Sequence, residues 1–117
     1  MKTVQKIIIT FGFIIMGNVT FAHPPKNISA VYDPGNEEIT IFVEHYSSEP
    51  HTHYVEVISI SDEKGILNTQ SFMDQTSNDK QVYKMTLKGK KPGDSIEINC
   101  KCNKFGKKRK TVVLETV

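Results

Sequence analysis

The chain has 117 residues, a formal net charge of +2 and a charged fraction of 24%. This length is enough for one domain with a thin hydrophobic core. The sequence contains neither a glycine-rich phosphate-binding loop nor a Ser/His/Asp or paired-carboxylate arrangement. It therefore offers no recognisable residue set for phosphate cradling or for the commonest hydrolytic mechanisms.

Residues 1–22 have the pattern of a secretory signal peptide. Two lysines precede an apolar run at residues 7–16, and the segment ends on the small residue Ala22. The run is shorter than the roughly 20 residues of a membrane span, and an uncleaved N-terminal anchor is the alternative. We predict export to the periplasm or the medium, cleavage after Ala22, and a mature domain at 23–117 without a membrane span.

After the predicted cleavage site, short runs rich in β-branched and aromatic residues alternate with turn signals such as DPGN and KKPGD. No helical period of 3.6 residues stands out. Strands at this spacing predict an all-β fold, an immunoglobulin-like antiparallel sandwich of about seven strands. The expected strands are 28–33, 38–46, 53–60, 66–72, 81–88, 94–102 and 110–116.

Charge is distributed unevenly along the predicted domain. Residues 23–79 hold ten acidic residues and two lysines, whereas residues 80–117 hold eleven basic and three acidic residues. A basic stretch in an exported β-domain is typical of a solvated or weakly anion-attracting surface, and we do not expect nucleic-acid binding. Its densest part, GKKRK at 106–110, is predicted to be a solvated turn.

All four histidines lie in the first third of the predicted domain, and two of them continue apolar strand faces. His45 follows Val43 on one buried face, and His53 precedes Val55 on another. A hairpin across the loop 47–52 that pairs Val43 with Val55 would set His45 opposite His53, with Cβ atoms about 4.5–5.5 Å apart. Two imidazoles at that spacing can share a metal ion. The alternative is that these polar residues only close the rim of the sandwich.

The two cysteines, Cys100 and Cys102, stand at the end of the core-facing side of the predicted strand 94–102. Residues i and i+2 of a strand lie roughly 6.6–7 Å apart and point the same way. A disulfide needs Cα atoms about 4.4–6.8 Å apart and converging Cβ vectors. We therefore predict that the two cysteines are not bonded to each other and that at least one thiol has another role.

Three short motifs resemble a known family. HPP at 23–25, EHYSSEPHTHYVEVISI at 44–60 and CNKFG at 102–106 look like the catalytic iron domain of superoxide reductases, that is, neelaredoxin and the C-terminal part of desulfoferrodoxin. The resemblance implies an immunoglobulin-like sandwich with non-haem ferrous iron held by four equatorial imidazoles and one axial thiolate. It further implies superoxide as substrate and an electron donor that the sequence does not identify.

The resemblance also assigns individual ligands. His23 matches the first imidazole, His45 the second and His53 the third, while Cys102 matches the axial thiolate. The position of the fourth imidazole is occupied by Phe105. The site expected from the resemblance is therefore a superoxide-reductase-like centre with one imidazole missing, and the neighbouring GKKRK run could attract superoxide.

A second interpretation starts from the predicted cleavage site. If His23 is the mature N-terminus, its α-amine and imidazole can together chelate copper, with His45 or His53 completing the site. This arrangement is similar to that of exported copper-binding sandwich proteins with an N-terminal histidine. In the superoxide-reductase-like interpretation, the loop residue His51 could take the place of the missing imidazole. A non-catalytic module with a vestigial site, or a purely structural sandwich, are the remaining alternatives.

Overall fold

The computed structural model describes residues 24–115, so the predicted signal peptide and His23 lie outside the described residues. Alternation of apolar and polar residues produces strands close to those expected from the sequence. The seven strands are β1 (Asn27–Asp33), β2 (Glu38–Glu44), β3 (Val55–Asp62), β4 (Gly65–Ser71), β5 (Lys80–Thr86), β6 (Ser95–Cys102) and β7 (Lys107–Val113).

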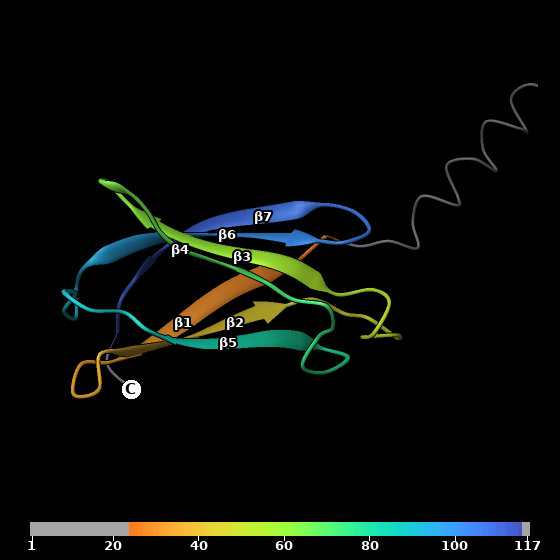
Figure 1. The fold of residues 1–117 in the computed structure, drawn as a ribbon, viewed down its shortest axis with the longest axis horizontal. Coiled ribbons are helices and arrows are strands. Elements are labelled where there is room, and N and C mark those ends of the chain that lie inside the picture. Colours follow the sequence, from red (N-terminus) through yellow and green to blue (C-terminus); the bar gives the residue numbers. More distant parts are fainter. Residues whose placement is uncertain (1–23, 116–117) are drawn as a thin grey trace, which may run out of the picture.

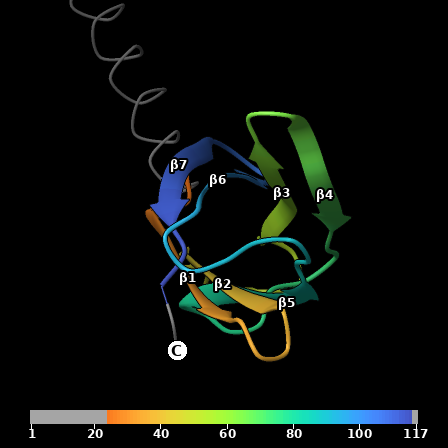
Figure 2. The ribbon, with the colours of Figure 1, turned by 90° about the vertical axis from the view of Figure 1, so that its left-hand side faces the viewer.

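These strands form two antiparallel sheets that pack face to face (Figures 1 and 2). One sheet has the order β1-β2-β5 and the other has the order β4-β3-β6-β7. The all-β sandwich predicted from the sequence is thus confirmed. Residues 24–115 include no helix, and so none that is long and apolar enough to cross a membrane.

The core lies between the sheets and is built from the alternating positions of the central strands. Ile39, Ile41 and Val43 of β2 are completely buried, and Ile96 and Ile98 of β6 face them from the other sheet with at most 1% exposure. Full burial of one such side chain stabilises the fold by about 1.5–3 kcal/mol. This packing holds the strand ends, and therefore the side chains just beyond them, in fixed relative positions.

The predicted hairpin between 38–46 and 53–60 is wrong. β2 pairs with β1 and β5, whereas β3 pairs with β4 and β6, so the two strands lie in different sheets. The connection at 45–54 passes from one sheet to the other (Figure 1). The physical reason is that both strands have an apolar face to bury, and in a sandwich such faces meet across the core instead of lying side by side.

The GKKRK run is also placed differently from the prediction. β7 starts at Lys107, so most of the run is strand instead of turn. The connection is reduced to residues 103–106, and Gly106 occupies a positive φ of 86° that favours glycine in a tight turn. The basic residues therefore pair with β6 and lie along the four-stranded sheet.

At the end of the sandwich where β1 and β3 finish, polar groups close the core. The Tyr32 side chain is completely buried, and its hydroxyl donates to the carbonyl oxygens of Leu87 (3.0 Å) and Lys90 (3.1 Å). Lys90 Nζ also lies 2.7 Å from Asp62 Oδ2. Burial raises the pKa of the Tyr32 hydroxyl, which therefore stays protonated and available as a donor.

Candidate metal centre

At the opposite end of the sandwich, where β2 and β6 end and β3 begins (right-hand side of Figure 1), two histidines and one cysteine come together from three segments. His45 directly follows β2, His53 lies two residues before the start of β3, and Cys102 is the last residue of β6. One ligand atom from each residue lies within 4.8 Å of the others. The group can hold a metal ion, because imidazole nitrogen and thiolate sulfur are both good transition-metal ligands.

His45 is held by a buried amide. Its side chain is 1% exposed, and its Nδ1 lies 2.7 Å from Oε1 of Gln75, which is itself 5% exposed. The orientation of the Gln75 amide follows from the backbone groups around it. Its nitrogen faces the carbonyl oxygens of His45 (2.7 Å) and Ser77 (2.8 Å), and its oxygen faces the N–H of Val55 (3.2 Å).

This arrangement determines the tautomer of His45. Since the Gln75 oxygen can only accept a hydrogen bond, His45 Nδ1 must carry the hydrogen and donate it. The lone pair of the neutral ring then resides on Nε2. An imidazole whose second nitrogen donates to a carbonyl-type oxygen is the usual form of a metal-ligating histidine.

The second histidine lies against both other members of the group. His53 Nε2 is 3.1 Å from Cys102 Sγ, and the His53 ring meets the His45 ring edge to face, with centroids 4.8 Å apart and planes at 87°. The expected proximity of His45 and His53 is therefore observed. It arises between segments from different sheets instead of from cross-strand pairing.

Asn103 fastens the connection that carries His53 to the strand that carries Cys102. Its Oδ1 accepts from the N–H of Tyr54 (2.9 Å), its Nδ2 donates to the carbonyl of Thr52 (3.0 Å), and its own N–H donates to the carbonyl of Tyr54 (3.0 Å). On the other side of the connection, Ser47 Oγ donates to the carbonyl of His53 at 2.6 Å. These bonds position His53 without using its ring nitrogens.

The sulfur of Cys102 lies in a turn that provides a backbone donor. The residue is 1% exposed, and the N–H of Lys104 points at Sγ from 3.4 Å. The turn is closed by the Cys102 N–H donating to the carbonyl of Gly106 at 3.0 Å. These two backbone contacts hold the Cys102 side chain in place within the turn.

The N-terminal segment packs on this same turn. A Cβ atom at Gly106 would collide with Pro24, so glycine is required there by close approach as well as by its positive φ. Pro24 directly follows His23 in the chain, and His23 itself lies outside the described residues. The segment that follows the predicted ligand His23 therefore packs beside the cysteine turn.

Three residues considered at the sequence level stand apart from the group. The His51 side chain is 86% exposed and pairs with Asp74 at 3.7 Å. Phe105 is 52% exposed. Cys100 is buried in the core, where burial raises the pKa of its thiol to about 11. Both cysteines are free, which confirms the prediction that they are not bonded to each other.

Sequence reasoning missed the two amides that organise the site. Asn103 directly follows Cys102 in the CNKFG motif, so its place beside a candidate ligand was a usable signal. Gln75 carries no comparable signal, because it lies in the connection between β4 and β5, far along the chain from His45.

The fold and the site together define a β-sandwich protein with a candidate His/His/Cys metal centre at one end. Neither a scan against protein-family models nor a search of curated proteins finds a match to the chain.

Proposed function

We propose that this protein binds a redox-active transition metal through His45, His53 and Cys102 and that its iron form reduces superoxide. The proposal is carried by one observation: three ligand atoms from distant parts of the chain lie within 4.8 Å of one another in a largely buried setting. The hydrogen bond from Gln75, which leaves the lone pair of His45 on Nε2, supports a ligand role for this ring.

The donor set narrows the choice of metal. Two imidazoles and one thiolate suit iron, copper, nickel or zinc and are poorly suited to calcium or magnesium, which prefer oxygen ligands. Bonds of about 2.1 Å to nitrogen and 2.3 Å to sulfur place these atoms about 3.6 Å apart at a tetrahedral angle and about 3.1 Å apart at a right angle. The observed distance of 3.1 Å between His53 Nε2 and Cys102 Sγ is short enough for both atoms to bind the same metal ion.

In this proposal, an iron ion held by His45, His53 and Cys102 would supply the electron that, together with two protons, reduces superoxide to hydrogen peroxide, and a one-electron donor would have to replace that electron. The protein residues supply the environment for that reaction. Cys102 contributes an electron-rich sulfur, as cysteine does in thiolate-ligated haem enzymes. The N–H of Lys104 moderates the charge on that sulfur, and Gln75 keeps the His45 ring in one orientation.

We assign the remaining coordination to residues near the turn 102–106. His23 is proposed as a further ligand, because its neighbour Pro24 packs on Gly106. Phe105 occupies the position where the superoxide reductase motif has a histidine, so the centre is proposed to have three imidazoles instead of four. We expect weaker iron binding and slower superoxide reduction than a complete set would provide.

Copper binding without catalysis is the second candidate. Two histidines and one cysteine form the donor set of trigonal copper sites that transfer electrons, and copper binds more tightly than the other divalent ions to such ligands. Cleavage after Ala22 would add the α-amine of His23 as a further nitrogen donor. An intact mass of the exported protein tests the cleavage site, and a mature start several residues from His23 would remove this additional donor.

Metal titration tests the site itself. We expect one ferrous ion per chain under anaerobic conditions and, after oxidation, a thiolate-to-ferric charge-transfer band. Cys102→Ser should abolish the band and weaken binding by roughly 100-fold, whereas Cys100→Ser, two residues away on the same strand face, should change neither. Equal effects of the two substitutions would contradict the assignment. Electron paramagnetic resonance of protein from its native compartment distinguishes ferric iron from Cu(II).

Stopped-flow mixing of the ferrous protein with superoxide tests the reaction. We expect oxidation of one iron per superoxide well below the diffusional limit of roughly 10⁸–10⁹ M⁻¹s⁻¹. Phe105→His should raise iron affinity and strengthen the thiolate–iron band. If the protein binds iron through Cys102 but does not react with superoxide, the iron-binding part of the proposal stands and the catalytic part fails.

A further inference from the structure

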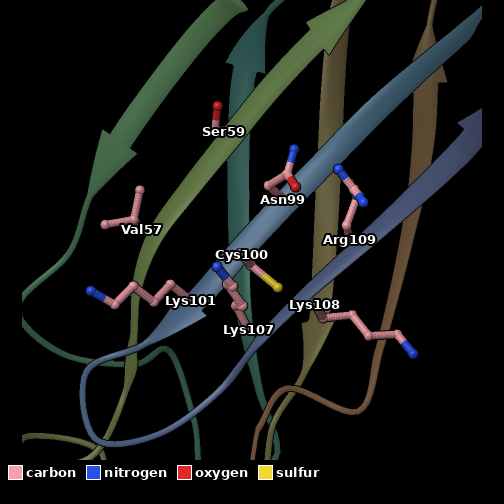
Figure 3. Close-up of a pocket in the computed structure, with 8 residues that line it drawn as sticks. All are labelled: Val57, Ser59, Asn99, Cys100, Lys101, Lys107, Lys108 and Arg109. Carbon is pink, nitrogen blue, oxygen red and sulfur yellow. The ribbon is translucent and has the colours of Figure 1, made fainter.

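A pocket of about 460 Å³ lies on the four-stranded sheet, over β3, β6 and β7 (Figure 3). Six of its lining residues project from the face opposite the core, in two rows across the three strands. One row holds Val57, Lys101 and Lys107, and the other holds Ser59, Asn99 and Arg109. The volume falls within the range of about 300–1,000 Å³ typical of small-molecule sites.

The register of β6 and β7 concentrates positive charge in this pocket. Lys101 is directly opposite Lys107, and Arg109 is opposite Asn99 in the adjacent row. Like charges at directly opposed positions of an antiparallel pair destabilise the sheet. An anion placed between them would relieve that repulsion, so the pairing is more favourable with such a ligand bound.

Neighbouring carboxylates only partly neutralise the pocket. Lys101 Nζ lies 3.9 Å from Glu56 Oε1, and Arg109 Nε lies 4.0 Å from Glu97 Oε2. Both distances are at the outer limit of an ion pair, and the cationic side chains are 63% and 70% exposed. Exposed pairs of this kind contribute little and exchange readily with a competing anion.

The uncharged lining residues add hydrogen-bond donors and an apolar surface to the charged groups of the pocket. Asn99 Nδ2 donates to Glu97 Oε1 at 3.3 Å and has a second hydrogen to offer, the Ser59 hydroxyl is a further donor, and Val57 provides an apolar surface beside the charged row. The two rows are about 6.6–7 Å apart, as positions i and i+2 of a strand are. A ligand with two anionic groups can therefore contact Lys101 and Lys107 with one group and Arg109 with the other.

We propose that this pocket binds a small oxyanion ligand with at least two negatively charged groups, such as a polycarboxylate or a diphosphate. The site is separate from the candidate metal centre, because Lys101 and Lys107 point away from the core whereas Cys102 is buried within it. The inference does not depend on the proposed function.

Calorimetric and NMR titrations with pyrophosphate, citrate and inorganic phosphate test the proposal. We expect pyrophosphate and citrate to bind at least tenfold more tightly than phosphate at 0.15 M salt, with shifts confined to the two rows and affinity falling as salt rises. Pyrophosphate should also raise the melting temperature. Equal, weak binding of all three anions, or shifts spread over every lysine, would overturn the proposal.

Charge-reversal variants provide the matched comparison. Lys107→Glu should abolish pyrophosphate binding and raise the melting temperature, because it converts the opposed like charges into an opposite pair. Lys88→Glu, an exposed lysine in the loop after β5, makes the same change in net charge and should leave binding within twofold. If both variants lose binding equally, the effect is one of net charge and the pocket is not a site. Arg109→Gln, expected to weaken binding at least fivefold, serves as a second variant should Lys107→Glu misfold.

Discussion

Polar side chains are buried at both ends of the sandwich, but they are paired in different ways. At one end, the Tyr32 hydroxyl reaches two backbone carbonyls and Lys90 pairs with Asp62. At the other end, His45, His53 and Cys102 face one another and are held from behind by the amides of Gln75 and Asn103. Among residues 24–115, no buried side-chain nitrogen or oxygen lacks a hydrogen-bond partner at either end.

The difference lies in the chemistry of the groups that meet. At the Tyr32 end, donors meet backbone acceptors and the charges cancel, so the arrangement is complete within the protein. At the His45 end, three side chains of metal-ligating type converge, and their supporting hydrogen bonds come from the side-chain amides of Gln75 and Asn103 and from backbone groups. We therefore expect substitutions at the first end to change stability and substitutions at the second end to change metal affinity.

Tyr32→Ala should have the largest effect. Removing a fully buried aromatic side chain and its two hydrogen bonds should lower the free energy of unfolding by about 3–5 kcal/mol. Tyr32→Phe keeps the ring and should cost only about 0.5–1.5 kcal/mol. Denaturant unfolding measures both values. Metal affinity of the folded variants should be unchanged, and a parallel loss of affinity would show that the two ends are coupled.

His53→Ala tests the candidate metal centre, and His51→Ala in the same connection serves as its control. We expect metal affinity to fall by roughly 100-fold or more, because a direct ligand should matter at least as much as an outer contact. His51→Ala removes an exposed imidazole two residues away and should leave affinity within about twofold. Isothermal titration with the metal found in the native protein provides the comparison. A larger loss of metal affinity in His51→Ala than in His53→Ala would mean that His51 is the ligand instead of His53.

Gln75→Met should lower both the metal affinity and the stability of the protein. The variant keeps a similar volume but removes the oxygen that orients His45 and the nitrogen that satisfies two carbonyls. Metal affinity should fall by about 10–100-fold, as for other outer contacts, and stability without metal should fall by about 1–3 kcal/mol. If stability falls and metal affinity does not, Gln75 has a structural role alone and His45 needs no orienting partner.

The smallest expected effect concerns pH and the Asp62–Lys90 pair. The hydrogen bond from Lys90 lowers the pKa of Asp62 below its ordinary value of 3.8. The stabilisation is therefore fully present above about pH 4 and is lost as the pH falls through the lowered pKa. The difference in melting temperature between wild type and Asp62→Asn should shrink between pH 6 and pH 3. A difference that stays constant over this range would mean that the charge of Asp62 does not stabilise the fold.

Much of the candidate metal centre could be predicted, because histidines and cysteines that continue an apolar strand face can be recognised from the sequence. His45 and His53 stand at the ends of apolar faces, and Cys102 ends a third, so the sequence indicated each residue separately. Their partners could not be predicted in the same way. The contact of Gln75 with His45 joins residues 30 positions apart. A glutamine in a connection between strands is usually exposed, and no pattern in the surrounding sequence predicts that Gln75 is buried.

Local alternation of apolar and polar residues was enough to predict seven strands and most of their buried faces, although the last strand begins three residues earlier than expected. Which strands share a sheet depends on contacts between distant segments. The tertiary structure places β2 and β3 in different sheets, so His45 and His53 meet across the end of the core instead of along a hairpin. It also places Lys107 and Arg109 in β7, where the register against β6 brings them to the pocket on the outer face of the sheet. Pairing and register depend on how all the apolar faces can be buried together, and no single segment contains that information.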